Sequence, residues 1–372
     1  MTARARRVAI MTGVCTRHDA ISNVVRTQQQ LLTEAGYDAR VITQHTDFPS
    51  EGHIVCSDPW LLQRDPWYRS ADLVILHFGI QYGLFDSLVL SHPSATRVVH
   101  FHNVTPPDLL TGSSRVQAVR GIDQLTIATR ADAVWSDSAH NTECLLEWTD
   151  VDPAVVTVMP LSAPWVTDDS IHHIPVTPRH QVIRVLGVGR FVPAKGQRDI
   201  VEAAALLRSR SAGPFQIELV GALAPSDPDY LDELRDLIAE LEVESVVQLT
   251  LDPSDAELQD RYVSSDVFVT ASRHEGFCVP VVEALLTGCR VVSTDSGALA
   301  ETVGPCGRLV PVGDVEALAD ALGAAIDDAR NAGPFDADVV ADHLSTFTIE
   351  AFTERTLRQV DSLIGPSTRC DT

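Results

Sequence analysis

Short apolar runs alternate with segments of helical periodicity along this chain. In the first half, the runs that read as β-strands are residues 7–11, 40–43, 73–76, 97–101 and 133–135. A segment with helical spacing, residues 22–35, lies between the first two runs and stops at Gly36, a residue suited to the left-handed position after a helix. Strands that alternate with helices predict a parallel sheet wound with crossover helices.

The second half repeats this alternation. Its strand-like runs are residues 183–188, 217–220, 246–249, 267–270, 290–293 and 308–310, with helical segments at 198–209 and 230–241. A proline-rich stretch without periodicity, residues 159–180, separates the halves and is typical of a linker. We therefore predict an α/β protein of two Rossmann-like, doubly wound domains that face a central cleft.

These patterns also predict the domain boundaries. We expect an N-terminal domain at residues 1–165, a linker at 166–182 and a C-terminal domain at 183–345. A last helix, about residues 348–364, has Ile349, Phe352, Val360 and Leu363 on one face. We expect the segment 346–372 to pack back on the N-terminal domain through this face.

Composition narrows the class of protein. A hydrophobic content of 45% with 21% charged residues is typical of globular proteins, and the net charge of -23 argues against general binding to nucleic acid or anionic lipid. The seven cysteines form no Cys-x-x-Cys pair, which favours free thiols in a reducing cytoplasm. No apolar run is long enough to span a membrane. We expect a cytoplasmic protein, with peripheral association at the inner membrane surface left open.

One stretch contains the only lysine of the chain. "GVGRFVPAKG", residues 187–196, directly follows the predicted strand 183–188 and ends with Lys195 and a glycine. A dinucleotide-binding loop would need a third glycine where Val192 stands, and no Gly-Lys-Ser/Thr of a P-loop occurs in the chain. The stretch therefore favours a turn, loosened by Gly189, that presents Arg190 and Lys195 to an anion. The alternative is two solvated surface cations.

A second stretch, residues 272–304, follows the predicted strand 267–270. A helix that opens at about Pro280 would aim the backbone amides before it at an anion; these amides belong to Gly276, Phe277 and Cys278. Glu275 lies in the loop, and Glu283 is expected in the first turn of this helix. The alternatives are an ordinary exposed loop acid for Glu275 and a carboxylate favoured by the helix dipole for Glu283.

Carboxylates beside an anion site suit the hydroxyl groups of a sugar better than the anion itself. A site that combines cations, backbone amides and hydroxyl acceptors therefore predicts a nucleotide sugar as the ligand.

These motifs resemble those of a known family. Glu275 and Glu283, with seven residues between them, are similar to the E-x7-E motif of retaining glycosyltransferases of family 4 (glycosyl transferases group 1), which have the GT-B fold. "GRFVPAKG" is similar to the family's donor-phosphate motif. In the first half, "GVCTRHDAISN", "VVHFHNVTPP" and "SDSAHN" resemble the N-terminal loop, the central histidine motif and the approach to the linker. The chain departs from the family at Cys278, often a glycine, and at His18-Asp19, where relatives favour Gly-Asp.

The resemblance implies a reaction. A sugar would pass from a nucleoside diphosphate, bound by the C-terminal nucleotide-sugar-binding domain, to an acceptor hydroxyl on the side of the N-terminal domain. The anomeric configuration would be retained, and the reaction would belong to glycan, glycolipid or glycoside biosynthesis. Arg190 and Lys195 would neutralise the leaving diphosphate. Glu275 would hold hydroxyls of the donor sugar and Glu283 those of the ribose. His102 matches the family's histidine near the donor sugar, although a satisfied polar residue at a strand end is the alternative.

The resemblance thus yields a set of candidate residues. Those expected to be catalytic are His102, Arg190, Lys195 and Glu275; those expected to bind substrate are Gly13, Asp19, His100, Asn103, Gly189, Gly276, Phe277, Cys278 and Glu283. His100 alternates with His102 along the strand and is expected to share its face. We expect neither a cofactor nor a metal ion, because the Asp-x-Asp triplets at residues 150–152, 227–229 and 336–338 follow no convincing strand end.

Three rival functions remain open. A sugar-nucleotide epimerase of the same fold would turn over the donor without an acceptor. A glycan phosphorylase would release sugar phosphate and usually needs a far longer chain. A catalytically silent nucleotide-sugar-binding protein would bind the donor and show neither transfer nor hydrolysis.

Overall fold

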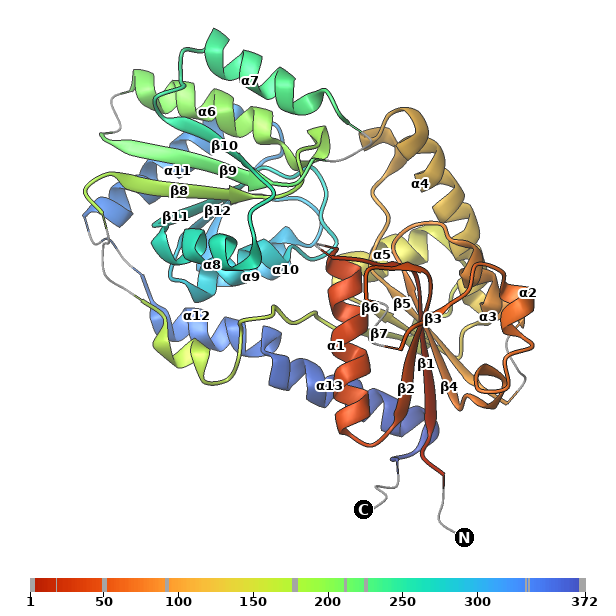
Figure 1. Ribbon diagram of the computed structural model, residues 1–372. Coiled ribbons are helices and arrows are strands. Elements are labelled where there is room, and N and C mark those ends of the chain that lie inside the picture. The colour runs from red at the N-terminus through yellow and green to blue at the C-terminus, as the bar shows by residue number, and fades with distance from the viewer. Residues whose placement is uncertain are drawn as a thin grey trace. The chain divides into compact units, whose positions relative to one another are not determined.

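The structure of the chain is a computed structural model that describes residues 4–17, 19–48, 52–90, 94–175, 180–210, 213–223, 227–331, 333 and 335–367. The chain forms two compact units (Figure 1). Unit 1 comprises Met1–Leu161 together with Glu350–Thr372, and unit 2 comprises Ser162–Ile349. In the described part of the chain, no helix is both long and apolar enough to cross a membrane.

Unit 1 is built on a seven-stranded sheet whose described strand pairs are all parallel. The strand order is β3-β2-β1-β4-β5-β6-β7. The strands are β1 (Arg7–Cys15), β2 (Asp38–Thr46), β3 (Ile54–Val55), β4 (Leu73–Phe78), β5 (Thr96–Phe101), β6 (Ala133–Ser136) and β7 (Val156–Val158). Every residue of β4 is buried, as expected for a central strand covered on both faces.

Six helices of unit 1 are described: α1 (Ala20–Glu34), α2 (Pro59–Leu62), α3 (Ser87–Leu90), α4 (Gly112–Leu125), α5 (Ala139–Trp148) and α13 (Ile349–Ile364). Helix α13 buries Phe352 and Val360 on one face. Its Arg355 donates to the carbonyl oxygen of Pro160 at 2.9 Å, and its Asp361 accepts from the hydroxyl of Tyr37. These contacts hold the end of the chain on unit 1.

Unit 2 contains a six-stranded sheet in the order β10-β9-β8-β11-β12-β13, again with parallel pairs in the described residues. Its strands are β8 (Ile183–Val188), β9 (Phe215–Gly221), β10 (Val247–Leu251), β11 (Val267–Thr270), β12 (Arg290–Thr294) and β13 (Gly307–Val310). Its helices are α6 (Gln197–Ser209), α7 (Tyr230–Glu240), α8 (Asp255–Ser264), α9 (Val279–Leu286), α10 (Leu299–Val303), α11 (Val315–Arg330) and α12 (Ala337–Leu344).

The helices of unit 2 cover both faces of its sheet. Figure 1 shows α6 and α7 on one face and α8 and α9 on the other, and α6 also packs against α11. Between α6, α7, α11 and the sheet lies an apolar core that includes Phe191, Leu207 and Leu322. The two sheets confirm the predicted fold class of two Rossmann-like, doubly wound domains.

The strand orders fix where a ligand can bind. In each sheet the first strand has the second strand on one side and the fourth on the other, so the chain leaves its central strands in opposite directions. In open α/β sheets, ligands bind at such a switch point, at the carboxyl ends of the strands. In unit 2 this point lies between β8 and β11, and in unit 1 between β1 and β4.

Candidate functional site

The loop after β8 lies tightly against its neighbours. The amide of Gly189 donates to the carbonyl oxygen of Val220 at 2.9 Å, and a Cβ atom on Gly221 would lie 2.0 Å from the carbonyl oxygen of Gly189. Gly196 has a φ of 66°, and a Cβ atom there would lie 2.0 Å from the carbonyl oxygen of Ala271. Only glycine fits this approach, which fixes the neighbouring Lys195 at the end of β11.

Lys195 and Glu275 form an ion pair at this switch point. The Lys195 Nζ lies 2.6 Å from Oε1 of Glu275, and the Ser272 hydroxyl donates to the same oxygen at 2.7 Å. The side chains of the lysine and the glutamate are 26% and 11% exposed. The alternative of an ordinary exposed loop acid is therefore wrong for Glu275.

The electrostatics of the pair favour its charged form. Burial acts to lower the pKa of Lys195, but the carboxylate of Glu275 outweighs it and the pKa is raised above its usual value. Burial acts to raise the pKa of Glu275, but the ammonium of Lys195 and the hydroxyl of Ser272 together lower it. Both groups are therefore charged at neutral pH.

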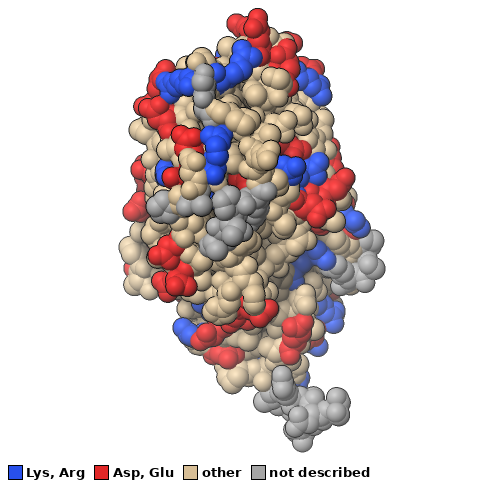
Figure 2. Space-filling model, turned by 90° about the vertical axis from the view of Figure 1, so that its left-hand side faces the viewer, with Lys and Arg blue, Asp and Glu red and all other residues tan. Residues whose placement is uncertain are grey.

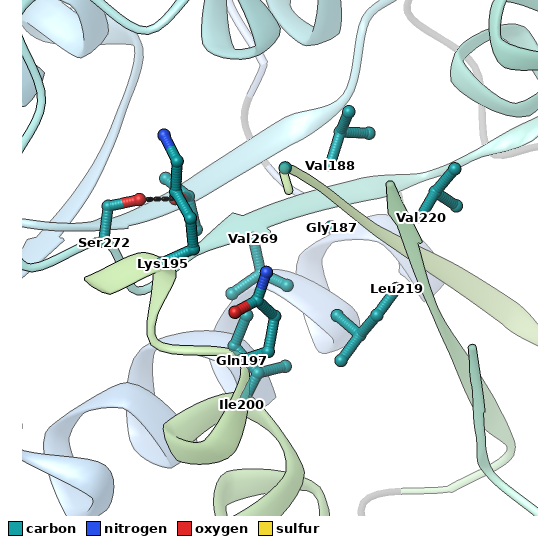
Figure 3. Close-up of a pocket in the computed structure, with 11 residues that line it drawn as sticks. Gly187, Val188, Lys195, Gln197, Ile200, Leu219, Val220, Val269 and Ser272 are labelled. Carbon is teal, nitrogen blue, oxygen red and sulfur yellow. Dashed lines mark hydrogen bonds between the residues drawn. The ribbon is translucent and has the colours of Figure 1, made fainter. Parts of the chain in front are cut away.

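A small pocket of about 10 Å³ adjoins this pair, which is room for about one water molecule. In Figure 3 the side chains of Lys195 and Ser272 lie at one side of this pocket, and those of Leu219 and Val220 lie at the other. Thr270 and Ser272 share a hydrogen bond of 3.1 Å there. The lysine thus stands at an edge of the sheet lined with hydroxyl groups.

Arg190 is exposed, and its backbone carbonyl accepts from the side chain of Gln197 at 2.8 Å. Its charge is close enough to Lys195 to oppose protonation of the ammonium. On the face shown in Figure 2, basic and acidic side chains occur in small separate groups. Because the net charge of the chain is -23, an anion would have to be held by a local pair of cations such as Arg190 and Lys195.

The loop that leads into α9 is fixed by backbone contacts. The carbonyl oxygen of Glu275 accepts from the amide of Ala298 at 2.9 Å, and that of Phe277 accepts from the hydroxyl of Thr302. Cys278 precedes the helix with a φ of 78°, a conformation that glycine adopts more readily. The family resemblance implies that glycine is frequent at this position, and glycine would adopt this backbone without strain. The expectation that Gly276, Phe277 and Cys278 bind an anion through their amides stays a prediction.

Glu283 differs from its expected position. Because α9 begins at Val279, Glu283 is the fifth residue of the helix and not part of its first turn, where no acidic residue lies. The expected placement was wrong because the helix starts before Pro280, and the helix dipole explains this carboxylate less well. Glu283 is buried, and burial raises its pKa to about 7, against the effect of the nearby Tyr262 hydroxyl.

In unit 1, three histidines gather at the carboxyl ends of β4 and β5. His77 pairs with His100 in the register of the two strands, and His102 follows directly after β5. The rings of His100 and His102 stack with centroids 4.4 Å apart, and the two side chains share a face as expected. Nδ1 of His77 lies 2.8 Å from Nε2 of His102.

Two further residues close this cluster into a ring. Asp137, after β6, lies 3.0 Å from Nε2 of His100 and 2.8 Å from Nδ1 of His102. Gln28 of α1 lies 3.0 Å from Nε2 of His77 and 3.2 Å from Nδ1 of His100. We call these five residues the histidine ring.

The histidine ring is shielded from water. The side chain of His102 is 3% exposed and that of Asp137 is 2% exposed. Burial lowers the pKa of His77 well below its usual value and that of His100 to about 4. Burial acts to raise the pKa of Asp137, but His102 and His100 outweigh it and lower the pKa.

The remaining candidates of unit 1 have local structural roles. Asp19 caps α1 by accepting from the amide of Ser22 at 2.8 Å. Asn103 has a φ of 72° and donates to the side chain of Asn141 at 2.8 Å. A Cβ atom on Gly13 would lie 2.9 Å from Cβ of Tyr82. His18, the other half of the departure from the family, lies outside the described residues.

Sequence reasoning missed several members of these clusters, namely Gln28, His77, Asp137 and Ser272. A signal existed for His77, which stands one residue before the end of "LVILHF" just as His100 does in "TRVVHF". Parallel strands with a histidine at the same offset would place both at one sheet edge.

The candidate metal motifs also have structural roles. Asp152 and Asp336, from two of the Asp-x-Asp triplets, accept hydrogen bonds from the amides of short helices at 2.9 and 3.1 Å. One nitrogen each from His77, His100 and His102 lies within 4.8 Å of the others. Both nitrogens of each of these histidines are already engaged in the histidine ring, so an ion could bind there only by displacing a shared proton.

Comparison with known proteins gives a family match. Residues 172–335 match the model of the family Glycosyl transferases group 1. A curated relative, the MMP alpha-(1->4)-mannosyltransferase of Mycolicibacterium hassiacum, is 36% identical over 155 residues, which are 41% of this chain and 36% of the relative. A D-inositol 3-phosphate glycosyltransferase of Corynebacterium urealyticum is 34% identical over 149 residues, 39% of this chain and 35% of the relative. The chain thus matches little more than a third of either relative's length.

Solved structures extend the likeness to nearly the whole chain. A glycosyltransferase from Rickettsia africae has a TM-score of 0.75 at 16% identity and covers 97% of this chain and 99% of its own. Anabaena HepE in complex with UDP-glucose has a TM-score of 0.69 at 18% identity and covers 96% and 99%. At this identity the likeness concerns the fold alone, and that fold is GT-B.

Proposed function

Because the chain has the GT-B fold and its residues 172–335 match the glycosyl transferases group 1, we propose that it is a retaining, metal-independent glycosyltransferase. It would move a sugar, of the hexose type, from a nucleoside diphosphate to an acceptor hydroxyl in glycan, glycolipid or glycoside biosynthesis. The observation that carries the proposal is the pair of Lys195 and Glu275 at the switch point of unit 2.

The two cations suit a leaving diphosphate. As the bond to the sugar breaks, negative charge builds on the phosphate oxygen, and fixed positive charge stabilises it most in the transition state. Lys195 supplies a compact charge on a mobile stem, and Arg190 supplies a planar fork for two phosphate oxygens. The carboxylate of Glu275 positions the ammonium of Lys195 at the carboxyl end of β11, where the ammonium would bind the diphosphate.

The two glutamates suit hydroxyl groups. Glu275 is ionised and presents a carboxylate beside the ammonium, so it can accept hydrogen bonds from hydroxyls of the donor sugar. Its ion pair with Lys195 and its bond from Ser272 favour this role over that of a nucleophile. Glu283 is expected to accept from the ribose. Transfer would then retain configuration through attack on the same face, with the leaving phosphate accepting the proton of the acceptor.

Thermal shift with a panel of nucleotide sugars tests donor binding. A donor at about 100 times its Kd should raise the melting temperature of the wild type by about 3–4 °C. Lys195→Ala should lose most of this shift. The matched control is Arg198→Ala, which removes a nearby cation that pairs with Glu202 on the surface of α6. No shift with any nucleotide sugar would contradict the proposal.

The stereochemistry has its own test. With the identified donor and acceptor, the anomeric configuration of the first product is read by proton NMR before any equilibration. We expect the configuration of the donor. The opposite configuration would show an inverting enzyme and contradict the front-face reaction.

A further inference from the structure

The hydrogen bonds of the histidine ring determine how many protons the ring must hold. It contains five hydrogen bonds, which join Gln28 to His77, His77 to His102, His102 to Asp137, Asp137 to His100, and His100 back to Gln28. Each hydrogen bond needs one proton between its two atoms. The closed ring therefore needs five protons.

Neutral side chains cannot supply that number. The amide of Gln28 contributes one donor and one acceptor, whichever way it is turned, and a carboxylate contributes none. Three neutral imidazoles contribute one proton each, which gives four with the amide. Without a fifth proton, two unprotonated atoms would face each other at hydrogen-bond distance inside a buried cluster, and such a contact is costly.

We propose that the histidine ring holds this additional proton on His102, as an imidazolium paired with the carboxylate of Asp137. Gln28, His77 and Asp137 are then positioning residues that keep His102 charged. Both N–H groups of His102 are then donated within the ring, to His77 and to Asp137, so His102 would influence transfer through its positive charge and cannot act as a general base. The proton count rests on geometry alone, whereas its consequence for transfer rests on the proposed function.

Three observations place the charge on His102. With the Gln28 oxygen toward His77 and its nitrogen toward His100, the additional proton can reside on His77 or on His102 but not on His100. His102 contacts the carboxylate at 2.8 Å, and His77 has no such contact in the ring. Burial lowers the pKa of His77, and the histidines lower the pKa of Asp137, which argues against a charged His77 and a protonated Asp137.

Substitutions change the proton count in a predictable way. Asp137→Asn supplies a proton of its own, so five bonds can form with all imidazoles neutral. Gln28→Met opens the ring and leaves three bonds, which three neutral imidazoles satisfy. Gln28 touches neither His102 nor Asp137 in the ring, yet its loss should remove the charge. Gln29→Met makes the same replacement one position along α1 and outside the ring, and it is the matched control.

NMR of the full chain with ¹⁵N-labelled histidine measures how many protons each imidazole carries. The measurement is made at about pH 8, where a free imidazole is neutral. We expect one imidazole with both nitrogens protonated in the wild type and in Gln29→Met, and its signal should be absent from His102→Leu. In Asp137→Asn and Gln28→Met, the ring histidines should each carry one proton. A singly protonated His102 in the wild type, or a doubly protonated imidazole kept in Gln28→Met, would overturn the proposal.

Kinetics then test the consequence for transfer. We expect Gln28→Met to have a kcat about tenfold below the wild type at pH 8, and to recover toward it as the pH falls to about 6, because acid restores the imidazolium. Gln29→Met should follow the wild type throughout. A kcat of Gln28→Met equal to that of the wild type at pH 8 would overturn the role in transfer. The NMR result needs no donor, so it stands apart from a failure of the proposed function.

Discussion

At the scale of single residues, Lys195 and Glu275 cannot be considered separately. The ammonium and the Ser272 hydroxyl bind the same oxygen of Glu275, so a change of either charged partner alters the other. Such neighbours are expected to show coupled rather than additive effects on activity. The contacts to this oxygen also fix the ammonium of Lys195 and the carboxylate of Glu275 at the carboxyl ends of the strands in the absence of a donor.

The two glutamates should respond differently to substitution by glutamine. Glu275 is expected to grip the transferred sugar, whose ring gains positive charge as the bond breaks, so Glu275→Gln should lower kcat more than it raises the donor KM. Glu283 is expected to bind the ribose equally in both states, so Glu283→Gln should mainly raise the donor KM. Steady-state kinetics with the identified donor measure both values. Equal effects of the two variants on both parameters would mean that the division of roles is wrong.

Glu283 also makes stability depend on pH. Burial raises its pKa to about 7 from 4.5, so the folded protein keeps a proton that the unfolded chain has lost between these values. Stability falls with rising pH wherever the folded state binds more protons. The contribution of the Glu283 carboxyl to the free energy of unfolding is therefore fully present below about pH 4.5. It is lost as the pH rises through about 7. The interval corresponds to about 3 kcal/mol.

Urea unfolding at about pH 5 and pH 8 measures this dependence. Glu283→Gln stays neutral, so the wild type should lose about 2.5 kcal/mol of unfolding free energy relative to this variant between pH 5 and pH 8. Glu233→Gln on the exposed face of α7 is the control and should follow the wild type. Parallel pH dependences of wild type and Glu283→Gln would contradict a buried, protonated Glu283.

At the scale of elements, the turn from Lys195 into α6 depends on one glycine. Gly196→Ala would combine a left-handed backbone with a Cβ atom 2.0 Å from the carbonyl oxygen of Ala271, so the loop must move away from β11. We expect a loss of at least about 2 kcal/mol in unfolding free energy together with weaker donor binding. Gly112→Ala is the control, because its φ of 52° is also positive but nothing lies within 4 Å. Similar losses in the two variants would show that contact with β11 is unimportant.

Elements with strong apolar runs were predictable from the sequence. The strands 183–188 and 267–270 have the expected bounds, because β-branched and other apolar side chains make up most of both runs. The strand expected at 7–11 continues to Cys15, since pairing with β2 extends it through polar and glycine positions. Strands β3 and β7 were missed because runs of two and three residues carry no periodicity.

At the scale of the whole molecule, the resemblance to glycosyltransferases and the fold could be predicted, and the histidine ring could not. The resemblance carried by Lys195, Glu275 and Glu283 is confirmed by the family match over residues 172–335 and by the GT-B fold. The ring joins Gln28 and Asp137 to strands that are distant in sequence, and their contact depends on the strand order. The strand order of the sheet cannot be predicted from the charge and spacing of residues along the chain. The roles assigned to the site residues stay predictions.

Metal independence is part of the proposed function and concerns the protein as a whole. We expect full transfer activity in excess EDTA, because in the proposed reaction Arg190 and Lys195 would neutralise the diphosphate in place of a metal ion. Activity with and without chelator, followed by addition of manganese, measures this. Loss of activity with EDTA and its return with manganese would instead support a metal-dependent reaction.

Transfer by Lys195→Ala at saturating donor tests the central claim most directly. The variant should fold normally and show a kcat about 10²–10³ below the wild type, because a charge aimed at the leaving diphosphate is lost. Lys195→Arg should recover only part of the activity, since its planar fork cannot reproduce a compact ammonium. Arg198→Ala should transfer like the wild type. Wild-type turnover by Lys195→Ala would contradict the assignment of this lysine and of the donor site around it.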